Sequence, residues 1–128
     1  MCFGIVPAGQ TTVVGLVQIW AVEPDLSTSE WGFVIGDSHW GTGLFPSAAR
    51  LALDFAFSSL GVNRLEARAV INNARGNAVL KKLGAKREGT LRRGFRQGDG
   101  FVDQSLWSIL ADDWAQLRRA DDQSGWMS

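Results

Sequence analysis

The stretch Trp40-Gly41-Thr42-Gly43-Leu44-Phe45-Pro46 is a glycine-rich turn between an apolar run that ends near Ile35 and a helix-like run that begins near Pro46. Two glycines let the backbone fold tightly with its N–H groups directed inward, and a following helix adds unpaired N–H donors and a partial positive charge. The stretch therefore predicts a phosphate-binding turn. A G-x-G turn between strand and helix also occurs without a ligand, so the flanking elements must decide between the two interpretations.

The elements on either side of the turn form a crossover. Residues Trp31 to Ile35 are apolar on both faces, as in a buried strand, and the internal Gly32 indicates a bulge or a close backbone approach. The apolar face from Pro46 to Leu60 is typical of a mostly buried helix. Arg64 to Ile71 then alternates with a period of two, which marks a strand. Strand, turn, helix and strand predict a βαβ unit with two parallel strands.

The remaining segments predict antiparallel strands and two short helices, and hence an α/β (α+β) fold with a mixed, mostly antiparallel sheet. Before the crossover we expect a hairpin of Phe3 to Val6 and Thr12 to Val22, followed by a polar loop at Pro24 to Ser29. After it we expect a helix that is capped by Asn72 or Asn73 and ends before Gly84, and then a hairpin of Arg87 to Gln97 and Phe101 to Leu110 around Gly98-Asp99-Gly100. The chain closes with a helix at Trp114 to Arg119 and a tail at 121–128 that we expect to fray.

Composition restricts the classes of function. The chain has 128 residues, of which 45% are hydrophobic and 20% charged, and this predicts a single domain over residues 1–128. With 13 basic and 13 acidic residues the net charge is zero, which argues against a nucleic-acid partner. Cys2 and His39 are the lone cysteine and histidine, so no soft-metal ligand set and no internal disulfide are expected. The N-terminus lacks a signal-peptide pattern and no stretch is long and apolar enough to span a bilayer, so we expect no membrane partner and a cytoplasmic location.

A set of sequence blocks carries a family resemblance. They are Glu30-Trp31-Gly32-Phe33-Val34-Ile35, Trp40-Gly41-Thr42-Gly43 leading into Ala48-Ala49-Arg50, Leu65-Glu66-Ala67-Arg68, Asn73-Ala74-Arg75-Gly76-Asn77-Ala78-Val79-Leu80-Lys81-Lys82-Leu83-Gly84-Ala85, Glu88-Gly89, and Asp103 to Trp107. Through them the chain resembles the GNAT superfamily of N-acetyltransferases, and within it the ribosomal-protein-alanine acetyltransferase (RimJ/RimL) type. The resemblance covers roughly Thr12 to Trp114, and the acetyl-CoA-binding core is expected over about residues 12–114.

The resemblance implies that acetyl-CoA, as co-substrate, lies in a V-shaped gap where two parallel strands separate. Main chain of the splayed strand would pair with the pantetheine amides, and the glycine-rich turn would hold the pyrophosphate. Arg75 and Lys82 would neighbour the phosphoadenosine end. The cofactor-binding residues implied are Phe33, Val34, Ile35, Trp40, Gly41, Thr42, Gly43, Leu44, Phe45, Asn73 and Asn77.

Glu30 stands where this branch of the family has a glutamate, so the resemblance implies a catalytic base that acts through water. An exposed strand-edge carboxylate, or the partner of an arginine, is an equally good interpretation of Glu30. Many family members use a tyrosine as general acid, but this chain contains none, so we expect that role to be vacant or filled by water. The chain also has Gly76 where the family normally carries a serine.

Family members begin with a strand and two helices that form much of the acceptor wall, and this chain starts after them. Three explanations are a shortened or fragmentary chain, a homodimer in which a partner supplies the wall, or a binding remnant without turnover. We favour the first, because the uncovered sheet would expose a large apolar patch. The resemblance implies acetyl transfer to a primary amine acceptor, first a protein or peptide N-terminus. A small-molecule amine, or acyl-CoA binding without catalysis, is the alternative.

Overall fold

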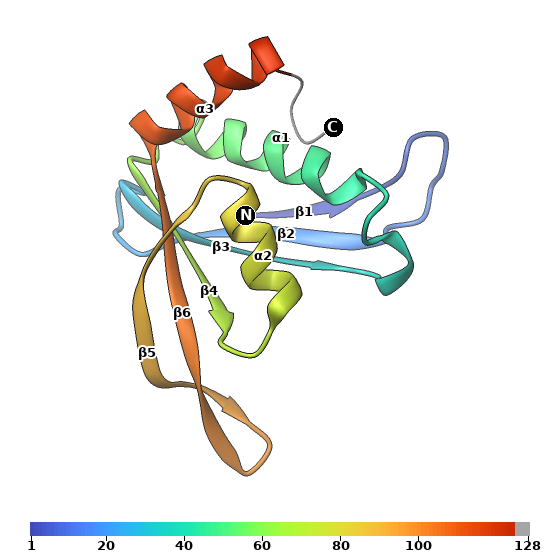
Figure 1. Cartoon of the computed structure of the whole chain (residues 1–128). Helices are drawn as coiled ribbons and strands as arrows, with labels where there is room; N and C mark the ends of the chain where they lie inside the picture. Colours follow the sequence, from blue (N-terminus) through green and yellow to red (C-terminus); the bar gives the residue numbers. More distant parts are fainter. Residues whose placement is uncertain (125–128) are drawn as a thin grey trace.

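The computed structural model describes residues 1–124 and contains a six-stranded mixed sheet with the strand order β1-β2-β3-β4-β6-β5 (Figure 1). The strands are β1 (Cys2–Ile5), β2 (Gly15–Ala21), β3 (Thr28–Ile35), β4 (Arg64–Val70), β5 (Lys86–Gln97) and β6 (Gly100–Leu110). The helices are α1 (Leu44–Ser58), α2 (Ala74–Lys82), α3 (Ala111–Ser124) and the short 3-10 helix η1 (Asp37–His39).

The sheet is built around one crossover. Strands β3 and β4 pair in parallel and are connected through α1, whereas the pairs β1–β2, β2–β3, β4–β6 and β5–β6 are antiparallel. The βαβ unit predicted from the sequence is therefore present, and the α/β class with a mixed, mostly antiparallel sheet is confirmed.

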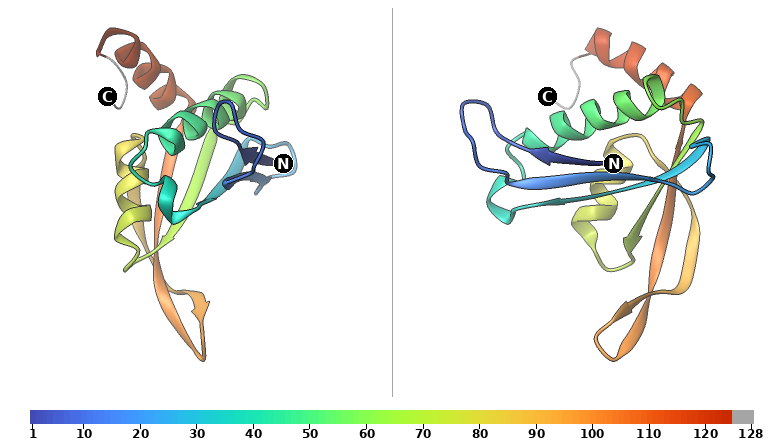
Figure 2. Two further views of the ribbon diagram at one scale, coloured as in Figure 1. Left: turned by 90° about the vertical axis from the view of Figure 1, so that its right-hand side faces the viewer. Right: turned by 180° about the vertical axis from the view of Figure 1, so that it is seen from behind.

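One face of the sheet carries the hydrophobic core. Successive side chains of a strand point to opposite faces, so alternate residues of β2 and β3 face the helices. The buried cluster joins those residues to both α1 and α2, which lie on the same side of the sheet (Figure 2). Its largest members include Val17, Trp31, Phe45, Leu53, Leu65, Leu80, Leu83 and Ile109. On the opposite face Leu16, Trp20 and Val34 remain exposed, as expected for a sheet without a covering layer there.

The start of β3 differs from the prediction. The strand begins at Thr28, so the predicted polar loop at Pro24 to Ser29 ends two residues too late. Thr28 and Ser29 are polar, and their strand conformation depends on the ladder with Arg64 and Leu65, which lie far away in sequence. The predicted bulge at Gly32 is wrong, because the β2–β3 register is continuous.

The other predicted possibility, a close backbone approach at Gly32, is also wrong, because the nearest atoms belong to the side chain of Trp20. A Cβ on this residue would lie 3.3 Å from Cη2 of Trp20, so glycine leaves the space in which the indole lies against the sheet.

The C-terminal helix is longer than predicted. α3 spans Ala111–Ser124 rather than Trp114 to Arg119, and it is held to α1 through Asp54. The Nε1 atom of Trp114 donates to Oδ1 of Asp54 at 2.7 Å, and Nε of Arg118 lies 3.0 Å from the same oxygen. Of the tail predicted to fray, residues 121–124 are helical and residues 125–128 lie outside the described part. Across residues 1–124, every helix is too short or too polar to traverse a lipid bilayer.

The β5–β6 hairpin extends past the rest of the sheet and projects away from the helices (Figures 1 and 2). Its register shifts between Arg87 and Gly89 and again between Leu91 and Phe95. At the second shift Arg93 has a positive φ of 53°, and its N–H donates to Oδ1 of Asp103 at 2.9 Å. Such bulges increase local twist, which is consistent with the direction in which the hairpin departs from the sheet.

Candidate active site

Strands β3 and β4 separate halfway along their length. Their parallel ladder covers only Thr28 to Glu30 on β3, opposite Arg64 to Glu66 on β4. Beyond Glu30, β3 continues beside β2 as far as Ile35, while β4 continues beside β6 as far as Val70. The two strands therefore form a V-shaped gap that opens toward their carboxyl ends, the place predicted from the sequence.

Main-chain groups of β3 line this gap at every second residue. In an antiparallel ladder a residue directs its N–H and C=O to one side, and the next residue directs them to the other. The N–H of Gly36 bonds to Val14 O at 2.9 Å, and Val34 O lies 2.6 Å from the position of a Cβ on Gly15, so both residues are turned toward β2. Phe33 and Ile35 consequently direct their main-chain groups into the gap.

This alternation requires one correction and one addition. Val34 was predicted to pair with a ligand through its backbone, but that backbone belongs to the β2–β3 ladder. Its side chain lies on the uncovered face and is 68% exposed. Trp31, two residues before Phe33, has the same orientation, but its N–H belongs to the last rung of the ladder with β4, so its C=O is the group that faces the gap; it was not predicted to bind through its main chain. The hydrogen-bond register between β2 and β3 decides which residues direct their main chain into the gap. The apolar pattern of the strand does not reveal that register.

The predicted glycine-rich turn follows β3 and leads directly into α1. Gly41 and Gly43 have φ angles of 78° and 84°, a region that glycine adopts without strain. The hydroxyl of Thr42 donates to His39 O at 2.7 Å and fixes the turn. α1 begins at Leu44, two residues earlier than predicted, with Gly43 as its N-cap and without a side-chain capping bond.

The N-terminus of α1 therefore presents unpaired main-chain N–H groups at the turn. The first N–H groups of a helix have no intrahelical acceptor. Those of Leu44 and Phe45 are in this position, the former with only a long 3.4 Å contact to Thr42, whereas Pro46 has no N–H to offer. Together with the two glycines they make a site suited to an anion.

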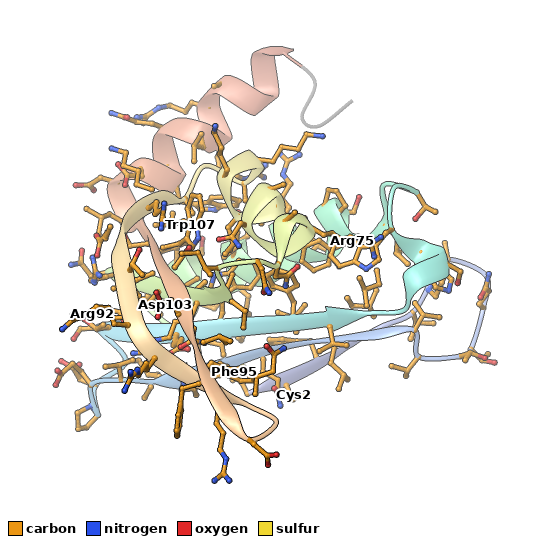
Figure 3. All side chains as sticks on the ribbon, turned by 60° about the horizontal axis from the view of Figure 1, so that its bottom comes forward. Cys2, Arg75, Arg92, Phe95, Asp103 and Trp107 are labelled. Atoms are coloured by element: carbon orange, nitrogen blue, oxygen red, sulfur yellow. The ribbon has the colours of Figure 1, made fainter. Side chains whose placement is uncertain are left out.

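A small pocket of about 210 Å³ adjoins the turn. It is lined by Trp40, Gly41, Gly43, Phe45, Pro46, Val79, Lys82 and Leu83. The Trp40 ring lies 5.4 Å from the Phe45 ring. The guanidinium carbon of Arg75, a residue labelled in Figure 3, lies 5.0 Å from the centroid of the Trp40 ring. Arg75 at the start of α2 and Lys82 at its end thus both lie near Trp40 of the turn.

The two predicted asparagines are both engaged inside the protein. Oδ1 of Asn73 accepts from the N–H of Gly76 at 3.0 Å, so Asn73 caps α2 as predicted. A Cβ on Gly76 would lie 2.7 Å from Nδ2 of Asn73, and the capping side chain is therefore packed closely against a residue that has no side chain.

Asn77 has a structural role. Its Nδ2 donates to Val70 O at 3.0 Å and to Asn73 O at 2.8 Å, and its Oδ1 accepts from Nε1 of Trp107 at 3.0 Å. Both amide protons and the oxygen are thus used within the protein. The geometry leaves the side chain without a spare donor for a cofactor, and the predicted contact has no support in it.

Glu30 lies at the apex of the gap. It is the last residue of β3 that pairs with β4, its side chain is only 15% exposed, and its Oε1 lies 3.7 Å from Nε of Arg68. Burial raises the pKa of this carboxyl, the neighbouring Glu66 raises it further, and Arg68 acts in the opposite direction. An ion pair of Glu30 with an arginine is therefore present, as one interpretation predicted, and it does not test the role of base. The strand-edge interpretation is wrong because β3 is an interior strand.

A second ion-pair network lies next to Glu30, and sequence reasoning did not identify it. Nε of Arg64 donates to Glu66 at 3.0 Å, and its Nη1 donates to Glu88 at 2.8 Å. Glu88 also accepts from the Ser108 hydroxyl at 2.7 Å. Hydrogen bonds from Arg64 and then Ser108 hold the pKa of Glu88 at about 2. The alternation of Arg64, Glu66 and Arg68 along one face of β4 was the available signal, but Glu88 and Glu30, with which the two arginines also pair, lie on other strands.

Other polar candidates are separate from the gap. Cys2 is exposed on β1, and His39 ends η1 before the turn. Among residues 1–124 no three His, Cys, Asp or Glu side chains are grouped in a way that would hold a metal ion. An apolar groove of about 440 Å³ lies between β1 and α1, lined in part by Phe3, Leu51 and Phe55.

Comparisons with known proteins agree with this geometry. The family described as Acetyltransferase (GNAT) domain matches residues 1–86. The probable N-acetyltransferase YjcK of Bacillus subtilis is 30% identical over 112 residues, which are 87% of this chain and 62% of that protein. The ribosomal-protein-serine acetyltransferase of Escherichia coli is 24% identical over 100 residues, 78% of this chain and 56% of that protein.

Solved structures give the same result for the fold. The crystal structure of a putative acetyltransferase from T. thermophilus superposes with a TM-score of 0.83 at 29% identity, over 95% of this chain and 64% of that one. This chain thus spans less than two thirds of the length of these relatives. By its match over residues 1–86, by these relatives and by the splayed β3–β4 pair, the chain belongs to the GNAT acetyltransferase domain family.

Proposed function

We propose that this chain binds acetyl-CoA between β3 and β4 and transfers its acetyl group to a primary amine, as an N-acetyltransferase. The observation that carries the proposal is the separation of the two strands after Glu30. It leaves the main-chain groups of Phe33 and Ile35 facing the gap, on the part of β3 that leads to the glycine-rich turn. The acceptor in this proposal is a protein or peptide N-terminal α-amine. Similarity to the ribosomal-protein-serine acetyltransferase supports that choice.

Each part of the cofactor has a counterpart in the site. Amides of the pantetheine arm are matched by the main chain of Trp31, Phe33 and Ile35 in the gap. The pyrophosphate is matched by N–H groups from Gly41 to Phe45, at the positive end of α1. Arg75 and Lys82, beside the Trp40 pocket, supply the positive charge for the remaining phosphate.

The chemistry requires a proton acceptor and a donor to the carbonyl oxygen. Acetyl-CoA supplies the acetyl group as an activated thioester. Glu30, at the apex of the gap, accepts a proton from the substrate ammonium through water. The amine nitrogen then attacks the thioester carbonyl, and the amide C–N bond forms as the C–S bond breaks. The nitrogen releases its second proton to solvent, and the thiolate takes up a proton from solvent. The N–H of Phe33, which faces the gap, polarises the carbonyl.

Calorimetric titration with acetyl-CoA tests binding, with a matched pair of glycine variants. Gly43→Ala places a side chain at a φ of 84° in the turn, and Gly98→Ala does so at 59° in the distant β5–β6 hairpin. Neither Cβ would contact another residue within 4 Å, so the two share backbone strain and differ in place. We expect at least tenfold weaker binding for Gly43→Ala alone. Equal affinity in both variants would contradict binding at the turn.

Thiol release with an alanine- or serine-starting peptide then tests turnover, with the N-acetylated peptide as blank. Release with the free peptide alone supports the proposed acceptor. Release only with a small amine such as a polyamine would replace the peptide by that class. Binding without release to any amine would contradict catalysis by this chain and leave a cofactor-binding module.

A further inference from the structure

The ion pair between Glu30 and Arg68 bridges the point where β3 and β4 begin to separate. Glu30 pairs with Glu66 as the last rung of the parallel ladder. Arg68 follows Glu66 by two residues on the same face of β4, alongside the part of β3 that has already turned away. The 3.7 Å contact between Nε and Oε1 therefore joins the two strands across the apex of the gap.

The neighbouring Arg64 does not compete with Arg68 for the carboxylate of Glu30, because its guanidinium is bonded elsewhere. Arg64 is held at 3.0 Å by Glu66 and at 2.8 Å by Glu88, on the far side of Glu66 from the gap. On the β2 side the residue opposite Glu30 is Trp20, which carries no charge. Within residues 1–124, the charged groups facing Glu30 are thus Arg68 and Glu66.

These neighbours act on Glu30 in opposite directions. Burial and the negative charge of Glu66 both favour the protonated carboxyl, which cannot accept a proton. Arg68 favours the ionised form and also restricts the direction of the carboxylate. Resting on the proposed function, we propose that Arg68 is a positioning residue that holds Glu30 ionised and directed across the apex of the gap.

Arg68→Gln tests this role through the pH dependence of kcat/KM. Glu30 has to be deprotonated, so activity falls as the pH falls through its pKa; removing Arg68 raises that pKa and moves the acidic limb to higher pH. Titration of the amine itself is common to all variants and cancels in the comparison. Arg68→Lys retains the cation, so its acidic limb should lie close to that of the parent chain. Glu66→Gln should move the acidic limb to lower pH.

The charge-matched control is Arg119→Gln, which removes the same charge from an exposed position on α3. It should leave the limb in place. A limb that moves equally in the Arg119 and Arg68 variants, or in neither, would overturn the inference. Acetyl-CoA affinity should change less than twofold in Arg68→Gln, because a positioning residue for the base is not a cofactor ligand.

A carboxyl carbon-13 NMR titration of Glu30 separates this inference from the proposed function, because it needs no turnover. Glu30→Gln assigns the resonance by its disappearance. A higher titration midpoint in Arg68→Gln than in the parent chain supports the inference even if no amine is acetylated, and an unchanged midpoint overturns it. If the acidic limb of activity survives in Glu30→Gln, the base assignment is wrong, whatever the NMR midpoint does.

Discussion

At the scale of single residues, charges on the uncovered face of the sheet are organised in pairs between strands. Arg64 joins Glu66 of its own strand to Glu88 of β5, and Arg68 reaches Glu30 of β3. A carboxylate that is held by an arginine and a hydroxyl titrates at lower pH than a free one. These pairs therefore make the free energy of unfolding depend on pH through individual carboxylates.

Glu88 supplies the clearest test of this dependence. Its pKa in the folded state, about 2, lies below the value of about 4.3 in the unfolded chain. The stability that Glu88 contributes is therefore complete above the unfolded-state pKa and is lost as the pH falls toward 2. Because the side chain is 38% exposed, we expect Glu88→Gln to cost only about 1 kcal/mol at pH 7. Urea unfolding at pH 7 and at pH 2.5 measures the difference, which should shrink at the lower pH. Glu23→Gln, in an exposed loop, is the control, and a cost independent of pH would contradict the assignment.

At the scale of elements, α2 is fastened to the sheet through Asn77. Its amide joins the last residue of β4 to the indole of Trp107 on β6, so it determines how β4 ends beside the gap. Asn73, at the other end of the same turn, caps the helix. The two residues thus link the helix cap to the wall of the candidate site.

Asn77→Ala would leave the buried indole N–H of Trp107 without its partner, whereas Val70 O would keep its bond from the N–H of Asn73 at 2.8 Å. We expect a loss of about 1 to 3 kcal/mol in the free energy of unfolding, measured with urea. Asn72→Ala, an exposed position just before the cap, should cost much less. If Asn77→Ala left stability unchanged and lowered acetyl-CoA affinity, Asn77 would be the cofactor ligand inferred from the sequence instead of a structural residue.

At the scale of the whole molecule, the helices cover one face of the sheet and leave apolar side chains on the other. Leu16 and Val34 stand directly opposite each other on β2 and β3, and Trp20 is 42% exposed nearby. Contiguous apolar surface of this kind favours association. We expect sedimentation velocity to show association that rises with concentration, and the double variant Leu16→Thr, Val34→Thr to weaken it. Leu51→Gln, on α1 at the other face, should not, and equal effects of the two would contradict the assignment.

Much of the fold was predictable because its signals are local. Apolar periodicity and the glycine-rich turn indicated the βαβ unit, and the Gly98-Asp99-Gly100 turn indicated the long hairpin. The prediction was weakest where a segment depends on distant partners. Thr28 and Ser29 are in a strand because β4 lies beside them, and α3 extends to Ser124, held to α1 by contacts with Asp54.

Local sequence predicted the order of the elements and the tight backbone of the glycine-rich turn, because backbone conformation at Gly41 and Gly43 and the phase of apolar side chains are properties of neighbouring residues. Contacts between distant strands set the point where β3 leaves β4, the main-chain groups that then face the gap, and the ion pair of Glu30 with Arg68. Those features depend on register between strands that are joined through a long helix. A shift of one residue would turn Phe33 away from the gap and Val34 into it, and no local pattern encodes that choice.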